Sequence, residues 1–378
     1  MERDISLKAH SDVKKELCDI VRQKKVPHAQ LFYNPNGVSP LTLVLAHVAY
    51  MHCLNKQGED ICGLCTACIK TSRYVHPDVH FLFPIGTTDK IKGKEVDKIT
   101  FLPLWRSFLA AQAYGNLEDW CAFIGSTTAR MQIGKDQVQS LRGILSEKSF
   151  ESDIKTVVVW LPETLNRVTA NKMLKMVEEP VPGTYFFFIS LAAHNILSTL
   201  RSRMWPTAIP PLDDQIMIAH FAKQYPARSQ ASISQVVGMA QGDLRLAEKM
   251  MADEELAYFE EFIDWLRQIY QQGYKRLVEI AEKFHTYAAH AQKNWIKYGL
   301  QLLRMVMTMP FQMAHIGHIS PEELDFCTKF GRTISRNKIA LLIQDLGALY
   351  GVLMRHANPK LAFIECSISA THILQHNG

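Results

Sequence analysis

The chain carries two short apolar runs, Thr156-Val-Val-Val-Trp-Leu161 and Thr184-Tyr-Phe-Phe-Phe-Ile189, in which polar and apolar residues do not alternate. Runs of this kind are typical of strands that are buried on both faces, as in a parallel sheet covered by helices. A helical pattern over residues 169–179 separates the two runs and ends before Pro180 and Pro182. Strand, helix and strand at this spacing predict an α/β domain with a doubly wound parallel sheet.

The same pattern extends toward the amino end of the chain. His28-Ala-Gln-Leu-Phe-Tyr33 is a further strand candidate, and a turn rich in Asn, Pro and Gly joins it to an apolar helix over residues 41–53. The first 210 residues therefore read as one α/β domain.

Beyond residue 210 the pattern changes to helices alone. Pro206, Pro210 and Pro211 mark a boundary, since each proline disfavours helix in itself and in the residue before it. Seven segments between residues 216 and 354 then show helical spacing; one example is the stripe of Leu342, Leu346, Leu349 and Leu353. We expect an all-α second half made of a small and a larger bundle.

Composition excludes several classes of protein. Nearly half of the 378 residues are apolar (47%) and 21% are charged, as in an ordinary globular protein. The net charge of +5 is too small to indicate nucleic-acid binding by itself. No apolar stretch is long enough for a membrane helix, and the first residues carry acid early without an apolar signal core, so we expect a cytoplasmic protein.

Four of the eight cysteines, Cys53, Cys62, Cys65 and Cys68, lie within sixteen residues. In a chain without an export signal such crowding favours a metal over disulfides. Thiolates at C-x₂-C spacing can converge on one tetrahedral Zn²⁺, and four of them leave no position for water, so we expect a structural zinc site. An iron–sulfur cluster and unrelated buried thiols are the alternatives.

A turn that reads Asn34-Pro-Asn-Gly37-Val-Ser39-Pro40-Leu stands between strand and helix, where a phosphate-binding loop would stand. A working loop reads G-x-x-x-x-G-K-[ST]: backbone N–H groups and the Lys bind phosphates, and the hydroxyl binds Mg²⁺. Here Asn34 and Ser39 replace glycines and Pro40 replaces the Lys, which removes both an N–H and a positive charge. We predict a degenerate loop; a simple turn would carry the same residues.

Two further observations concern charge. The acidic pair expected after the second strand is missing, and only a displaced Glu163 remains, so no ATP should be bound or hydrolysed by this chain.

Arg201 and Arg203 stand on either side of a serine before the proline boundary. Either both belong to a solvated face, or one of them reaches a phosphate on a neighbouring subunit. If the segment is extended, both arginines lie on the same face.

Taken together, these residues resemble the clamp-loader subunits of bacterial DNA polymerase III, in the degenerate delta-prime branch of the AAA+ class. The matching segments, in order, are residues 26–32, the cysteine cluster followed by His76-Pro77-Asp78, and residues 133–142, 170–180, 197–203 and 242–247. The resemblance covers residues 10–250, while the helical remainder fits by type only. Met204 stands where the family has Cys, and residues 87–130 are longer than the family pattern.

The resemblance implies three domains: a nucleotide-hydrolase-like (AAA+) domain over 1–210 with a zinc module near 53–78, a helical lid over 211–253 and a helical collar over 254–378. It implies a non-hydrolysing subunit that helps ATP-dependent loading of the sliding clamp onto primed DNA, together with gamma/tau ATPase and delta subunits. It also implies that Arg203 is an arginine finger in a neighbour's ATP site. Two other hypotheses remain: a zinc-containing nucleic-acid-binding protein on a dead nucleotide-binding fold, and an active ATPase.

Overall fold

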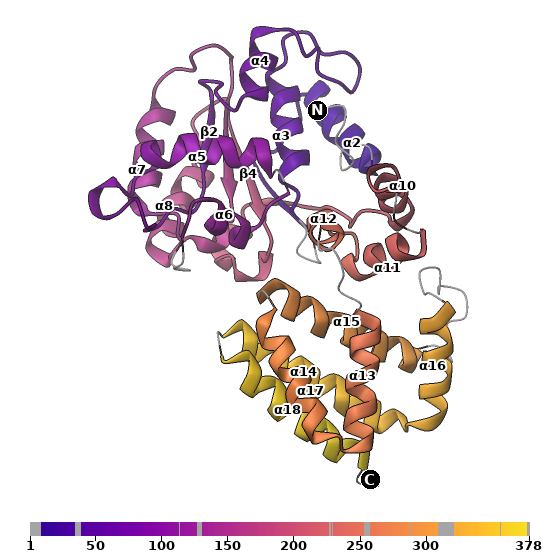
Figure 1. Ribbon diagram of the computed structural model, residues 1–378. Helices are drawn as coiled ribbons and strands as arrows, with labels where there is room; N and C mark the ends of the chain where they lie inside the picture. The colour runs from indigo at the N-terminus through magenta and orange to yellow at the C-terminus, as the bar shows by residue number, and fades with distance from the viewer. Residues whose placement is uncertain are drawn as a thin grey trace. The chain divides into compact units, whose positions relative to one another are not determined.

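The computed structural model describes residues 9–34, 39–112, 114–126, 131–226, 228, 230–252, 258–287, 289–308, 321–355 and 357–375. The chain forms two compact units. Unit 1 comprises Met1–Met217 and Gly242–Arg245, and unit 2 comprises Ile218–Gln241 and Leu246–Gly378. Figure 1 shows the sheet of unit 1 and its covering helices in indigo to magenta, and the helices of unit 2 in rose through orange to yellow.

Unit 1 is built on a five-stranded sheet in which every strand pair is parallel. The strands are β1 (Ala29–Tyr33), β2 (Val79–Leu82), β3 (Lys155–Trp160), β4 (Thr184–Ser190) and β5 (Trp205–Ala208), in the spatial order β2-β3-β4-β1-β5. The two apolar runs are the neighbouring strands β3 and β4, with Val158 beside Phe187. The predicted α/β domain with a parallel sheet, followed by an all-helical second half, is confirmed.

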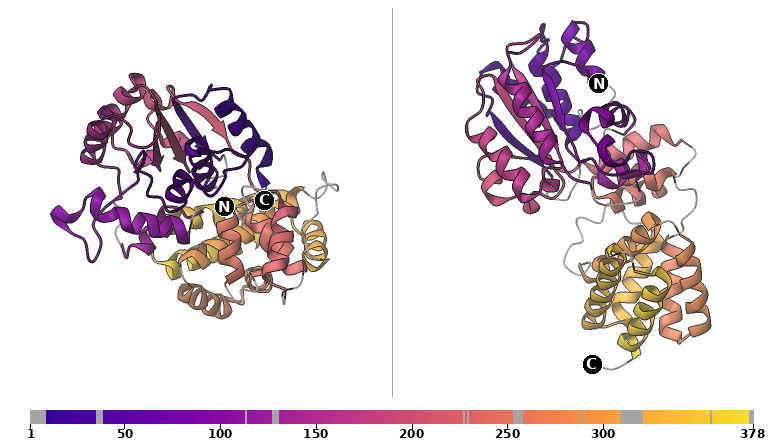
Figure 2. Two further views of the ribbon diagram at one scale, coloured as in Figure 1. Left: turned by 90° about the horizontal axis from the view of Figure 1, so that it is seen from above. Right: turned by 90° about the vertical axis from the view of Figure 1, so that its left-hand side faces the viewer.

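Helices cover both faces of the sheet, as the turned views in Figure 2 show. One core contains residues of α2 (Ser11–Arg22), α3 (Leu41–His52), α5 (Lys98–Ala111) and α6 (Leu117–Phe123); the other contains residues of α7 (Lys135–Ser146), α8 (Arg167–Glu178) and α9 (Ser198–Arg201). Strand β4 serves both cores, because Phe187 packs in the first and its neighbours Phe186 and Phe188 pack in the second. Burying each of these rings contributes roughly 2–3 kcal/mol.

The helix between β3 and β4 follows its sequence signals closely. Asn166 caps α8 by accepting a hydrogen bond from the Thr169 backbone N–H at 2.9 Å. The helix ends at Glu178, close to the predicted end, because Pro180 follows. The remaining short elements of unit 1 are α4 (Thr66–Ser72) and three 3₁₀ turns, η1 (Gly93–Glu95), η2 (Pro162–Thr164) and η3 (Ala193–Asn195).

The outer strands differ from the sequence analysis. Pro206 was expected to lie at the domain boundary, but it lies inside β5. Proline is tolerated there because β5 is an edge strand that pairs with β1 alone, so the missing N–H breaks no pairing on the open side. Strand β2 was not predicted, since its four residues include His80 and give little pattern.

From α10 onward every described element is a helix, as predicted. The helices are α10 (Asp214–Gln224), α11 (Gln230–Ala240), α12 (Leu244–Ala252), α13 (Tyr258–Gln271), α14 (Tyr274–Thr286), α15 (Ala289–Thr308), α16 (Pro321–Thr333), α17 (Arg336–Met354) and α18 (Pro359–Gln375). The predicted leucine stripe of α17 is buried. Among the helices described, none is long and apolar enough to cross a membrane.

His47 is a titratable group inside the first core of unit 1. It lies on α3 with its ring 5.3 Å from that of Phe187 and 6.4 Å from that of Phe32. Within the part of the chain that the structure describes, neither ring nitrogen has a hydrogen-bond partner. Burial lowers the pKa of His47 to about 4, since the charged imidazolium would lose its hydration.

We expect His47 to make unit 1 sensitive to acid. A histidine with a depressed pKa in the folded state contributes its stability above the unfolded pKa of about 6.5, and this stability is lost as the pH falls from there toward 4. Between pH 7 and pH 4.5 the loss from this group is about 2 kcal/mol. His47→Leu should remove this part of the pH dependence, measured by native-state hydrogen exchange of the α3 amides. The exposed His194→Gln is the control; equal pH profiles of wild type and His47→Leu would contradict the expectation.

Candidate functional site

The four predicted cysteines form one cluster in unit 1. Cys53 follows α3, Cys65 caps α4 and Cys68 lies in its first turn, so two helix ends and one loop supply the sulfur atoms. All four Sγ atoms lie within 4.8 Å of one another. Ligands of one tetrahedral zinc–thiolate centre lie about 3.8 Å apart, because each Zn–S bond is about 2.3 Å long. The cluster can therefore bind a metal ion after a small contraction.

The local backbone favours the thiolate form of Cys62 and Cys65. The N–H groups of Cys62, Cys65 and Cys68 point at the sulfurs of Cys53, Cys62 and Cys65, each at 3.4 Å. Hydrogen bonds from the backbone N–H groups of Leu64 and Cys65 lower the pKa of Cys62 to about 6. Gly63, at φ +71°, gives the C-x₂-C turn its left-handed residue. These features match the needs of a thiolate-bound cation.

Hydrogen bonds fix the loop between Cys53 and Cys62 to α3. The Lys56 ammonium donates to the carbonyl of Cys53 at 2.8 Å, and the Tyr50 hydroxyl donates to the carbonyl of Gly58 at 2.8 Å. The rings of the two nearby histidines, His52 and His76, lie 4.6 Å apart, and the ring nitrogens of His52 lie 3.0 Å from the hydroxyls of Ser152 and Thr156. His52 is therefore engaged elsewhere and is no ligand of the cluster.

The His76-Pro77-Asp78 segment has a structural task beside the cluster. The buried Asp78 carboxylate accepts hydrogen bonds from the backbone N–H groups of Phe150, Glu151 and Ser152 at 2.6, 2.7 and 2.9 Å. Burial raises its pKa, but these three donors outweigh that effect and the net shift is downward. Asp78 thus caps the turn that leads into β3.

The carboxyl edge of a parallel sheet is where α/β proteins bind ligands. At this edge Asn34 follows β1, and its buried side-chain amide donates to the carbonyl of Ile209, after β5, at 2.8 Å. Pro40 directly precedes α3 and provides no N–H at this helix end. Gly37, the glycine of the predicted degenerate loop, lies outside the described residues, and Ser39 is half-buried.

The expected acidic position at the end of β3 is occupied by a buried aromatic side chain. Trp160 is the last residue of β3, and its ring lies 4.9 Å from Trp105 and 5.9 Å from Phe108 of α5. The displaced Glu163 is used within the protein: its carboxylate accepts from the Ser190 hydroxyl at 2.9 Å and from the N–H of Leu191 at 3.0 Å. It therefore joins the ends of β3 and β4, a role that sequence spacing did not predict.

Arg203 lies on the surface just before β5. Its side chain is 43% exposed, and its Nε pairs with the carboxylate of Glu178 at the end of α8. Its Nη1 donates to the carbonyl of Thr199 at 3.0 Å. Two of the three guanidinium nitrogens are thus engaged, which fixes the direction of the planar group.

The local structure around Arg203 corrects one assumption. Residues 198–201 form α9, so the segment is not extended and the same-face argument for Arg201 and Arg203 does not hold. Arg201 donates instead to the carbonyl of Ala193 at 3.2 Å. Met204 is buried, whereas the next residue, Trp205, is 64% exposed.

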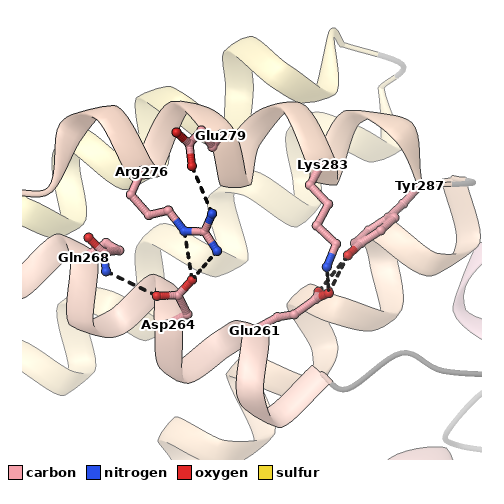
Figure 3. Close-up of polar contacts among 7 residues, drawn as sticks. All are labelled: Glu261, Asp264, Gln268, Arg276, Glu279, Lys283 and Tyr287. Carbon is pink, nitrogen blue, oxygen red and sulfur yellow. Dashed lines mark hydrogen bonds and ion pairs between the residues drawn. The ribbon is translucent and has the colours of Figure 1, made fainter.

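Unit 2 contains a polar cluster that the sequence analysis missed. Figure 3 shows Arg276 of α14 between Asp264 of α13 and Glu279, with Nε and Nη2 at 3.2 and 3.1 Å from the same Asp264 oxygen. Farther along the two helices the Tyr287 hydroxyl donates to Glu261 at 2.7 Å, and Lys283 also pairs with Glu261. Burial, and then this hydrogen bond, raise the pKa of Tyr287. Each charged side chain of the cluster has an oppositely charged partner within it, and these pairs join α13 to α14.

Comparison with known proteins identifies relatives of unit 1. The family model described as DNA polymerase III, delta subunit, matches residues 9–213, more than half of the chain. DNA polymerase III subunit delta-prime of Haemophilus influenzae is 26% identical over 185 residues, which covers 48% of this chain and 43% of the relative. The Escherichia coli subunit delta-prime is 25% identical over 197 residues, covering 52% and 46%.

The matched region is limited to part of each relative. The chain spans about half the length of the curated relatives that it matches. Among solved structures, it is similar to a DNA polymerase III gamma subunit-related protein from Thermotoga maritima at a TM-score of 0.37 and 13% identity, covering 95% of this chain and 99% of that chain.

Removing one sulfur should abolish metal binding by the cluster. In Cys65→Ser we expect the chain to lose its one bound metal ion and residues 53–72 to exchange amide hydrogens faster, since a structural zinc site contributes on the order of 10 kcal/mol to local folding. Metal analysis and hydrogen exchange measure the two effects. Cys121→Ser, a thiol outside the cluster, is the control. A wild-type chain purified without chelator and free of metal would contradict the prediction.

Proposed function

Because this chain belongs to the family described as DNA polymerase III, delta subunit, we propose that it serves as the delta-prime subunit of a clamp loader. The observation that carries the proposal is the family match over residues 9–213, which spans almost all of the α/β unit. In this role the chain joins gamma/tau ATPase and delta subunits. Through the complex it acts on the sliding clamp and primer–template DNA.

The domain roles follow from the same proposal. Residues 1–210 are the AAA+ nucleotide-hydrolase-like domain, 211–253 the lid and 254–378 the collar that builds the oligomer. Support comes from the change to helices alone after β5 and from the separate core of the second unit. The lid and collar division stays a prediction, since the two compact units divide the chain differently.

The metal of the cysteine cluster is Zn²⁺ in this proposal, with a structural role. Four sulfur ligands suit zinc and fill a tetrahedral coordination sphere, so no position remains for water or substrate. Zinc would hold the ends of α3 and α4 together beside β2 and would supply no reaction chemistry.

A second part of the proposal is that the chain does not hydrolyse ATP. Phosphoryl transfer needs a cation on the phosphates and a carboxylate or hydroxyl that holds Mg²⁺. Here Pro40 stands in place of the Lys, Trp160 is buried at the end of β3, and Glu163 is bonded to the loop after β4. Because polar groups at this edge of the sheet already form hydrogen bonds within the protein, few of them can bind a nucleotide.

We expect the isolated chain to bind ATP more weakly than about 1 mM and to show no ATP turnover above background, measured by calorimetry and phosphate release. Pro40→Lys alone should restore neither activity, because the apolar end of β3 still provides no metal ligand. Micromolar affinity together with turnover in the wild-type chain would overturn this part of the proposal and favour the active ATPase.

The third part of the proposal gives Arg203 a role in a neighbouring subunit's ATP site. Charge spreads over the γ-phosphoryl oxygens in the transition state, and a guanidinium stabilises it with two hydrogen bonds at once. Arg203 is half-exposed before an edge strand, and its ion pair with Glu178 is exposed as well. An exposed pair of this kind is worth at most about 1 kcal/mol, so a phosphate can replace the carboxylate.

Reconstitution of the full chain with clamp-loader ATPase and delta subunits tests the proposal in two steps. First, wild-type chain and Arg203→Ala should both enter the complex, because Arg203 lies outside the cores of unit 1. Second, Arg203→Ala should lower DNA-stimulated ATP hydrolysis and clamp loading roughly twofold to tenfold. This is less than the 10³–10⁵ of other arginine fingers, since one of several ATP sites uses the residue.

Arg201→Ala is the matched control for this measurement and should be milder, because Arg201 lies two residues farther than Arg203 from the edge strand β5. A wild-type chain that fails to join the complex contradicts the clamp-loader role. Unchanged rates with Arg203→Ala in an assembled complex contradict only the finger. Steeply salt-dependent DNA binding by the isolated chain would favour the nucleic-acid-binding alternative.

A further inference from the structure

The segment that carries α5 and α6 covers one end of the sheet and was not explained by the sequence analysis. Trp120 of α6 is fully buried, and its indole N–H donates to the carbonyl of Pro84, just after β2, at 2.9 Å. Its ring meets Trp105 of α5 edge to face at 5.5 Å and Phe108 at 5.2 Å. Helix α6 is therefore fixed to the core by a large aromatic anchor with a satisfied polar atom.

The residue before this anchor is a buried acid. Asp119 forms a capping box with Asn116: the Asp119 N–H donates to the Asn116 side chain, and the Asn116 N–H donates to the Asp119 carboxylate, both at 3.0 Å. The Asp119 side chain is only 5% exposed. The anchor and the cap thus hold a carboxylate in one place inside the protein, where a charge needs a partner.

That partner comes from a distant part of the chain. Arg245, 126 residues later, donates from Nη1 to the Asp119 carboxylate at 3.2 Å, and its side chain is 21% exposed. Its Nη2 lies 3.8 Å from the carboxylate of Asp243. Arg245 is the last residue of unit 1 before the chain passes into unit 2 within α12.

A second contact fixes the same short segment. The carbonyl of Gly242 accepts from the Leu212 N–H at 3.4 Å. Gly242 has a φ of +81°, and a Cβ there would meet Pro211 at 2.5 Å and the Leu212 nitrogen at 2.8 Å, so only glycine fits. Arg245 also lines a small hollow together with Asn34 and Pro40, beside the degenerate loop.

We propose that α6 is an internal clasp: the Asp119 carboxylate binds the Arg245 guanidinium and thereby holds residues 242–245 on unit 1. Asp119, which lies in α6, therefore provides the negative charge that balances the Arg245 guanidinium. A buried ion pair with a hydrogen-bonded carboxylate resists breaking, because removal of one partner leaves the other charge uncompensated. The inference concerns the fold of unit 1 and holds whether or not the chain works in a clamp loader.

Hydrogen exchange of the full-length chain tests the clasp. In Asp119→Asn the amide oxygen can still accept from Asn116, so the cap of α6 is kept while the charge is removed. We expect peptides that span residues 241–252 to exchange at least roughly tenfold faster than in the wild type, whereas α3 keeps its protection. Glu118→Gln is the matched control: it removes a charge from the same helical turn at an exposed position and should leave these peptides unchanged.

A double-mutant cycle identifies Arg245 as the partner. Arg245→Gln should accelerate exchange over residues 241–252 as Asp119→Asn does, and the combined variant should be no faster than either single variant. Exchange within twofold of the wild type in Asp119→Asn would overturn the clasp. So would independent, multiplying effects of the two substitutions, since Asp119 would then act only within α6.

Discussion

Burial of β3 and β4 on both faces is the constraint on which the rest of unit 1 depends. Both strands carry apolar side chains toward both sides of the sheet, so neither face can be left to water and helices must cover each one. Parallel pairing then requires long crossovers between strands, and α8 is the crossover between β3 and β4. The sheet, its two helical layers and its connectivity follow from these two strands.

The same connectivity brings the carboxyl ends of all five strands to one edge of the sheet. Polar side chains at that edge form hydrogen bonds with other residues of the same chain. Asn34 after β1 bonds to the chain after β5, and Glu163 after β3 bonds to the loop after β4. Each bond satisfies a group that would otherwise need a ligand or water. An edge of this kind stabilises the sheet, whereas the edge of a working nucleotide site must keep such groups available for phosphate and metal.

Sequence reasoning was most successful where the relevant residues are close together in the chain. The apolar runs predicted β3 and β4, and C-x₂-C spacing predicted the cysteine cluster, because backbone geometry alone brings residues three apart together. Within the predicted helical half, the position of α18 was not predicted, since its buried side includes Ser367 and Thr371 and gives a weak apolar stripe. The contact of Asp119 with Arg245 could not be predicted, because only the folded sheet brings residues 126 positions apart together. Tertiary contact, not local pattern, determines such pairs.

Arg203 and Arg245, two of the ion-paired arginines of unit 1, differ in how far water reaches their ion pairs. Arg203 and Glu178 are 43% and 37% exposed, so water screens their attraction and the pair is worth at most about 1 kcal/mol. Arg245 and Asp119 are 21% and 5% exposed, so water screens their attraction less, and removing one partner leaves the other charge uncompensated. The guanidinium is the same in both cases. An exposed pair can exchange its carboxylate for an incoming phosphate, while a buried pair keeps its partner and holds the chain in place. This difference in exposure supports the proposal that Arg203 acts on a phosphate, whereas the half-buried Arg245 has a structural role within unit 1.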